Sequence, residues 1–162
     1  MSINKPHYFK QNCDLLLSDG LKEYYLSNPL QVKEFADRFG KLLVNHDITH
    51  VVFGLGTSIE EETLLDTWTL RGTNITWKQI YQYSTNSELK ELTKIIVKDN
   101  GGWKNIFKVV IKCLPLKLKI HFNRIPKMKK KWPFSNVSDD MMNTSISDLR
   151  KEYGIKVIQV NS

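Results

Sequence analysis

Residues 28–62 read NPLQVKEFADRFGKLLVNHDITHVVFGLGTSIEEE, and this stretch indicates the fold class because two helix starts flank a glycine turn. Asn28, Pro29 and Gln31 occupy the cap, first-turn and capping-box positions of a helix start. Gly54 predicts the end of that helix. A long helix is therefore expected from residue 28 to the glycine turn.

The apolar residues of this predicted helix share one face. At 100° per residue they fall within an arc of about 140°, which is the width of a stripe that packs against a core. The arc contains Val32, Phe35, Ala36, Phe39, Leu42, Leu43 and Phe53. The helix is therefore expected to pack on the rest of the domain.

Further helices are expected along the chain. They cover residues 59–70, 86–98, 103–113 and 146–153, with a strand or extended tail at 155–160. The helix at 59–70 starts at a capping box formed by Ser58 and Glu61. The helix at 103–113 is expected to end before Pro115, because proline interrupts a helix interior.

The length and composition fit one globular domain. The chain has 162 residues and a mass of 18.9 kDa, with 41% hydrophobic and 25% charged residues, which excludes a disordered or fibrous chain. We expect a mostly α-helical, single-domain bundle. A helical domain is expected at 28–155, with an N-terminal segment at 1–27 and a C-terminal tail at 156–162.

Two further patterns restrict the location of the protein. No apolar run reaches the about 20 residues of a membrane-spanning helix, and the first ten residues lack an apolar stretch with a cleavage site. Cys13 and Cys113 form no CxxC pair, which argues against a thiolate metal site and a disulfide framework. A reducing compartment is expected, with the protein neither integral to a membrane nor exported.

Basic residues are concentrated in the middle of the chain. The net charge is +7, yet residues 94–131 alone contain twelve basic residues and one acid, Asp99. Lysines four residues apart beside apolar residues are typical of a helix that lies on an anionic membrane. The predicted membrane surface consists of Lys104, Lys108, Lys112, Lys127, Lys129, Lys130 and Lys131, with Trp132 as an interfacial aromatic residue.

Two alternatives to a membrane surface remain for these lysines. The first is a solvated face of an ordinary helical domain. The second is a nucleic-acid surface, which is disfavoured because lysine far outnumbers arginine and no nucleic-acid motif surrounds the segment. We therefore expect no nucleic acid among the partners.

Two of the four histidines lie in the first predicted helix. On a helix, His46, Asp47 and His50 fall within an arc of about 100° that overlaps the apolar stripe. Burying two imidazoles and a carboxylate without partners would cost several kcal/mol. A divalent metal ion would satisfy them, because histidines at i and i+4 can bind one ion together.

The second predicted helix begins with three glutamates. Glu61 belongs to the capping box, and Glu60 points away from Glu62. Glu62 has apolar neighbours on its face, so it is the expected carboxylate ligand beside His46 and His50. Asp47 is expected either as a further ligand or as the group that orients an imidazole. The structural alternative is a hydrogen-bonded pair of His and Asp in the core with solvated glutamates.

The spacing from His46 to Glu62 resembles a family signature. His46-Asp47, His50 and Glu62 match the HDxxH-x(11)-E pattern of the coenzyme Q biosynthesis protein 4 family. Phe53-Gly54-Leu55 resembles the glycine turn of that family. Leu149-Arg150 and Tyr153-Gly154-Ile155 resemble its closing helix. The similarity covers about residues 28–155, with gaps.

The resemblance implies a helical fold with an apolar groove for a polyprenyl tail. It also implies a metal at His46, Asp47, His50 and Glu62, which would be the catalytic residues. Zinc is the first expectation, with iron, cobalt, manganese and magnesium as alternatives. The implied chemistry is removal of the carboxyl group at ring carbon 1 of a polyprenylated hydroxybenzoate in ubiquinone biosynthesis.

The family further implies where the protein works and with what. The expected partners are the isoprenoid quinone precursor, an anionic membrane surface and other quinone-biosynthesis proteins, with a homodimer as a further option. The expected location is the cytoplasm, peripheral to the inner face of the cell membrane. In a eukaryote it would be the matrix side of the mitochondrial inner membrane.

Other function classes fit the residues less well. Gly54 and Gly56 suggest a nucleotide-binding turn, but Ile59 stands where a third glycine belongs. The HDxxH segment is similar to the HExxH helix of metalloproteases, but Asp47 is one methylene shorter than the required glutamate. A non-catalytic lipid-binding scaffold is the stronger rival, because a metal can hold two helices together without chemistry.

Overall fold

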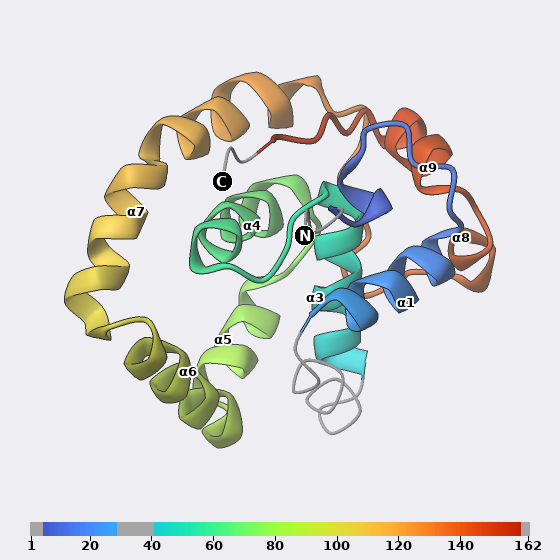
Figure 1. The fold of residues 1–162 in the computed structure, drawn as a ribbon. Coiled ribbons are helices and arrows are strands. Elements are labelled where there is room, and N and C mark those ends of the chain that lie inside the picture. The colour runs from blue at the N-terminus through green and yellow to red at the C-terminus, as the bar shows by residue number, and fades with distance from the viewer. Residues whose placement is uncertain (1–4, 29–40, 160–162) are drawn as a thin grey trace.

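A computed structural model describes residues 5–28 and 41–159, and helices dominate this part of the chain (Figure 1). They are η1 (His7–Phe9), α1 (Leu17–Ser27), α3 (Lys41–Phe53), α4 (Ile59–Gly72), α5 (Trp77–Thr85), α6 (Ser87–Asp99), α7 (Gly102–Lys119), η2 (Ile120–Arg124), η3 (Ile125–Lys127), α8 (Asp139–Met142) and α9 (Ile146–Tyr153). Over those two ranges the structure contains isolated bridges but no strand. The mostly helical, single-domain fold is confirmed, and the apolar groove stays a prediction.

Helix α3 lies at the centre of the fold (Figure 1). Every residue from Asp47 to Phe53 is buried, so this part of the helix is enclosed on all sides. Helices α1, α4 and α9 and the turn η1 pack around it. The predicted helix start at Pro29 and the apolar residues from Val32 to Phe39 lie outside the described residues.

Helix α4 begins at the predicted capping box. Ser58 Oγ accepts a hydrogen bond from the Glu61 backbone N–H, and Ser58 Oγ also donates to Glu61 Oε2 at 2.7 Å. Further along α4, the indole of Trp68 stacks on the ring of Phe53, with centroids 4.7 Å apart. The cap and the stack together hold α4 against the C-terminal end of α3.

The packed core extends beyond the expected boundaries at residues 28 and 155. Tyr8, Leu17 and Tyr24 are buried although they belong to the expected N-terminal segment, and Ile158 is buried in the expected tail. Helix α1 packs directly against α3. The described parts of the two end segments therefore belong to the same domain, and residues 155–159 form neither a helix nor a strand.

Arg150 of α9 connects three separate parts of the core. Its guanidinium is fully buried and donates to the carbonyl oxygens of Val51, Val52 and Tyr8 at 2.8, 2.8 and 2.6 Å, and to that of Lys10 at 2.5 Å. The two valines end α3, where carbonyls lack helical partners. Burial lowers the pKa of Arg150 to about 10, so it stays charged at neutral pH and caps α3.

The expected helix end before Pro115 is wrong. Helix α7 contains Pro115 in its interior and continues to Lys119. Cys113 before the proline and Ile120 after it are both buried in the core. Burial of this inner face on both sides of Pro115 outweighs the missing backbone donor, so packing overrides the local preference.

Trp132 is not an interfacial aromatic residue, because its side chain has no exposed surface. Its backbone N–H donates to Gly72 O at 2.9 Å, and its carbonyl accepts from Asn74 N–H at 3.0 Å. Its ring lies against Tyr153, with centroids 5.0 Å apart. These contacts tie the chain after η3 to the end of α4 and draw the indole inward.

Helices α5, α6 and α7 follow one another around the outside of α4 (Figure 1). Helix α5 starts at a capping box of Thr76 and Gln79, a signal that the sequence contains but that was not among the expected helices. Helix α6 covers the predicted 86–98 segment within one residue. None of the helices in the described ranges is both long and apolar enough to cross a bilayer.

Candidate metal centre

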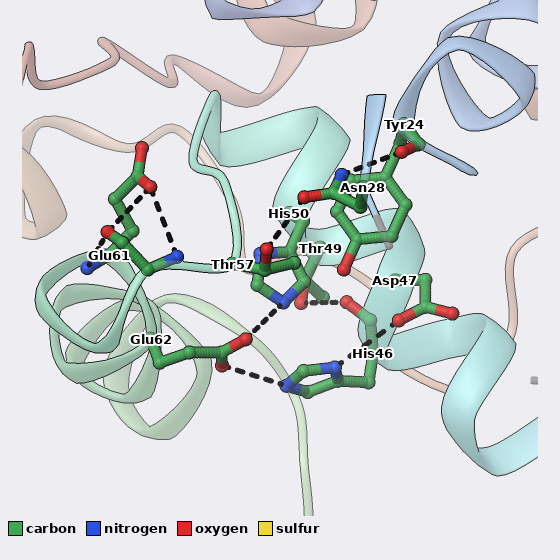
Figure 2. Close-up of polar contacts among 10 residues, drawn as sticks. Tyr24, Asn28, His46, Asp47, Thr49, His50, Thr57, Glu61 and Glu62 are labelled. Carbon is green, nitrogen blue, oxygen red and sulfur yellow. Dashed lines mark hydrogen bonds and ion pairs between the residues drawn. The ribbon is translucent and has the colours of Figure 1, made fainter. Parts of the chain in front are cut away.

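His46 and His50 lie one turn apart on α3 and face the first turn of α4 (Figure 2). Their rings meet edge to face, with centroids 4.8 Å apart. His50 has no exposed surface, whereas the His46 side chain keeps 27% of its surface exposed. The pair therefore has one imidazole against the core and one that a ligand can reach.

The imidazole of His50 is fixed but not satisfied. The ring of Tyr24, from α1, stacks on it with centroids 5.0 Å apart. In the part of the chain that the structure describes, His50 Nδ1 has no hydrogen-bond partner, and the only partner of Nε2 is the Glu62 carboxylate, 3.3 Å away and outside full hydrogen-bond geometry. Buried polar atoms without partners are costly, so this imidazole indicates a ligand at Nε2.

Glu62 of α4 supplies the carboxylate that faces both imidazoles (Figure 2). Its Oε1 lies 3.3 Å from His50 Nε2, and its Oε2 lies 3.9 Å from His46 Nε2. One ligand atom from each of the three residues lies within 4.8 Å of the others. The predicted meeting of His46, His50 and Glu62 is therefore present.

Asp47 lies behind His46 rather than within this group. Its Oδ1 is 3.6 Å from His46 Nδ1, the nitrogen on the far side of the ring from Glu62. Its Oδ2 accepts a hydrogen bond of 3.0 Å from the hydroxyl of Tyr25. Of the two roles expected for Asp47, this position favours orientation of the imidazole over direct metal ligation.

The charges at the site raise the pKa of His46 and lower the pKa of Glu62. Burial alone would lower the pKa of His46, but the contact with Asp47 and the charge of Glu62 outweigh it and raise this pKa. Burial alone would raise the pKa of Glu62, but the nearby charges of His50 and His46 lower it. The Glu62 carboxylate attracts a cation, and metal binding would compete with protonation of His46.

The comparisons with known proteins assign no family. No protein-family model matches this chain, and no curated protein or solved structure is significantly similar to it. The comparisons therefore neither favour nor disfavour the resemblance carried by the HDxxH-x(11)-E spacing.

The donor set fits a divalent transition metal. Two imidazole nitrogens and one carboxylate oxygen are a common catalytic zinc set, and the same ligands suit iron, cobalt and manganese. Two ligand atoms about 2.1 Å from a tetrahedral metal lie about 3.4 Å apart, close to the 3.3 Å between His50 Nε2 and Glu62 Oε1. His46, His50 and Glu62 could therefore hold an ion and leave a position open.

The neighbouring acids are placed elsewhere. Glu61 is engaged in the capping box with Ser58, as predicted. Glu60 is half-buried beside α7, where its carbonyl lies near Cys113 Sγ. Asp66, one turn after Glu62, is exposed and outside the ligand group. Glu62 is thus the carboxylate that meets the histidines.

Tyr24 and Tyr25 are the site residues that sequence reasoning missed. Both come from α1, in the segment that was expected to precede the domain. Asn28 ends α1 and donates to Tyr24 O at 2.6 Å, while Thr57 donates to Asn28 Oδ1 at 2.7 Å (Figure 2). These bonds join α1 to the turn before α4, so the tyrosines are held from both sides of the site.

The predicted membrane lysines are all exposed. They are Lys104, Lys108 and Lys112 on α7 and Lys127, Lys129, Lys130 and Lys131 after it. Lys130 forms an ion pair with Glu152 at 2.5 Å and lies over the ring of Tyr153. Lys127 and Lys129 line a cavity of about 700 Å³ beside α9. The α7 lysines and the later lysines therefore have different surroundings.

Proposed function

We propose that this protein is a metal-dependent lyase of ubiquinone biosynthesis that removes the ring carboxyl group from a polyprenylated hydroxybenzoate. The observation that carries this proposal is the convergence of His46, His50 and Glu62, with a buried imidazole whose only polar partner among the described residues is the Glu62 carboxylate. The spacing of these residues, which resembles the coenzyme Q biosynthesis protein 4 signature, supplies the substrate class.

The reaction breaks the bond between the ring carbon and the carboxyl carbon. The electron pair stays on the ring, carbon dioxide leaves, and a proton from solvent takes its place. A bound divalent metal supplies Lewis acidity that stabilises negative charge on the carboxylate or phenolic oxygen. The fully buried His50 would hold the ion from the core side, and the partly exposed side chains of His46 and Glu62 would lie nearer to the approaching substrate.

A contact between the glycine turn and α9 also supports the proposal. Gly54 has a φ of +67°, and a Cβ at this position would lie 3.2 Å from Arg150 Nη2. The glycine turn and the closing helix, the two further segments of the resemblance, therefore touch each other directly. Their contact stands at the C-terminal end of the helix that carries both histidines.

A non-catalytic scaffold is the second candidate. The same ion would then join α3 to α4 and stabilise a surface for lipid or for other quinone-biosynthesis enzymes. The observation that favours it is the structural setting of His50, which is enclosed on the core side by Tyr24. A scaffold would need the metal in order to bind lipid or other enzymes, and it would form no product from the hydroxybenzoate.

The two candidates are separated by a turnover experiment. Purified protein loaded with zinc, cobalt or manganese is incubated with a short-chain prenyl hydroxybenzoate carrying ¹³C in its carboxyl group. A lyase releases labelled carbon dioxide, loses this activity in Glu62→Gln and keeps it in the neighbouring control Glu61→Gln. Lipid binding without any release of carbon dioxide supports the scaffold, and release from metal-stripped protein contradicts both the site and the mechanism.

A further inference from the structure

Helix α7 carries an apolar face that the fold leaves exposed. Its inner face packs on α4 through residues such as Cys113. The opposite face presents large apolar side chains with between 47% and 68% of their surface exposed. These are Trp103, Phe107, Ile111, Leu114 and Leu118. At 100° per residue they occupy an arc of about 80°, so they form one continuous stripe along the helix.

Lysines lie directly beside this stripe. Lys104, Lys108, Lys112 and Lys119 occupy the next arc of about 80° and are all exposed. The sequence of α7 from Gly102 to Lys119 contains no acidic residue. The helix thus has three faces, one packed on the domain, one apolar and exposed, and one basic.

The exposed stripe belongs to the outer edge of the molecule. Figure 1 shows α7 along the outside of the fold, on the far side of α4 from the central helix α3. At 1.5 Å per residue the 18 residues of α7 extend about 27 Å. The exposed stripe therefore extends over most of the length of α7 on the outside of the fold.

We infer that the outer face of α7 docks the protein on an anionic lipid bilayer, with the apolar stripe inserted among the acyl chains. A helix with a large apolar face and an adjoining lysine row lies in the interface plane, where its lysines meet anionic headgroups. Insertion by the stripe distinguishes this inference from attraction of the lysines alone. It brings the metal centre to the place where a polyprenylated substrate resides, and in this respect it rests on the proposed function.

Two other occupants fit the charge less well. A second copy of this chain, docked about a two-fold axis with the two α7 helices antiparallel, would bring two lysine rows together, and like charges repel. An acidic protein would pair with the lysines but must also cover a stripe that includes Trp103 and Phe107. An anionic bilayer supplies both a negative surface and an apolar interior.

The test uses vesicles of phosphatidylcholine mixed with phosphatidylglycerol, and vesicles of phosphatidylcholine alone. Binding is expected to need the anionic lipid and to weaken as salt rises. The double variant Phe107→Ser, Leu114→Ser is expected to lower the partition coefficient at least about tenfold. The matched control Leu26→Ser, on α1 with 86% of its surface exposed, is expected to leave it unchanged.

The lysine row is tested separately. Changing Lys104, Lys108 and Lys112 to glutamate is expected to reduce binding to anionic vesicles about a hundredfold or more. The control Lys78→Glu, an exposed position on α5, removes one lysine elsewhere and is expected to have little effect. Circular dichroism of each variant verifies that the helices are retained.

Insertion of the stripe is tested by fluorescence. Trp68 and Trp132 are buried, so the Trp77→Phe variant leaves Trp103 as the exposed indole. Brominated lipid is expected to quench this emission strongly in Trp77→Phe and much less in Trp103→Phe. Equal quenching in the two variants would overturn insertion by α7.

Three other results would overturn the inference. They are absence of vesicle binding at low salt, preference for an oligonucleotide over anionic vesicles, and a dimer that Phe107→Ser dissociates while vesicles are not bound. Metal content is measured on the same samples. If the α7 variants keep their metal but no longer bind vesicles, docking by α7 is independent of the metal centre. If the wild type binds vesicles but no metal, the proposed function is contradicted and the docking inference is not.

Discussion

The hydroxyl of Tyr25 donates a hydrogen bond to Asp47, and the other oxygen of that carboxylate faces His46 Nδ1 at 3.6 Å. The chain from Tyr25 to Asp47 to His46 thus begins on α1 and ends at an imidazole whose Nε2 faces Glu62. Groups that orient a metal-binding imidazole from behind fix its ring orientation and contribute to metal affinity. We therefore expect Asp47 to position the imidazole of His46 rather than to bind the metal.

Removing this support is expected to weaken metal binding without abolishing it. Asp47→Asn is expected to raise the dissociation constant for Zn²⁺ about 10- to 100-fold, and Tyr25→Phe by a smaller factor. Competition with a zinc-sensitive dye measures both constants. A loss in Asp47→Asn as complete as that in His50→Ala would make Asp47 a direct ligand instead.

The stacking of Tyr24 on His50 is expected to matter through its ring. Tyr24→Leu removes the stacked contact and leaves a gap in the core, so it is expected to lower the free energy of unfolding by about 2 kcal/mol. It is also expected to weaken zinc binding. Tyr24→Phe keeps the ring and should restore both properties, as measured by urea denaturation and zinc titration. Failure of this rescue would assign the effect to the hydroxyl.

Arg150 is expected to be essential for stability. Its replacement by alanine strips buried donors from carbonyl groups of Val51, Val52 and Tyr8 and should destabilise the protein by about 3 kcal/mol or more. The neighbouring Lys151→Ala, at an exposed position on α9, serves as a control expected within about 0.5 kcal/mol of the wild type. Comparable urea midpoints for the two variants would refute the capping role.

Glu23 is expected to make stability depend on pH. Burial alone would raise its pKa, but hydrogen bonds from the backbone and ring of His7 and the backbone of Tyr8 lower it below the ordinary 4.5. Because the folded pKa is lowered, this stabilisation is complete above the unfolded pKa. It is lost as pH falls through the folded pKa. Thermal melting of wild type and Glu23→Gln should therefore converge under acidic conditions, and a constant difference from neutral pH downward would contradict this.

Local signals in the sequence predict much of the fold. The cap at Ser58 and the stop at Gly154 depend on residues within one turn, so α4 and α9 start or end where expected. Pro115 and Trp132 were misplaced because distant packing decides both. The first is held by an inner face buried on both sides, and the second by pairing with the end of α4.

The residues of the candidate site could likewise be predicted only where local sequence signals place them. His46, His50 and Glu62 could be found because the histidines are one helical turn apart and the capping box of α4 fixes the face on which Glu62 lies. Tyr24 and Tyr25 could not be found in this way, because they lie on α1, a segment with no fixed spacing to the histidines. Contacts between elements far apart in sequence carry no periodic signal, so these two tyrosines appear only in the folded structure.

Metal content is the most direct test of the central claim. Wild-type protein, His50→Ala, Glu62→Gln and the control Glu61→Gln are loaded with Zn²⁺, desalted and measured by inductively coupled plasma mass spectrometry. Glutamine retains the capping box at position 61, so that control should stay folded and metal-bound. We expect about one metal per chain in wild type and Glu61→Gln, and most of it lost in the other two. Equal metal content in wild type and His50→Ala, or none in the wild type, would contradict the metal centre.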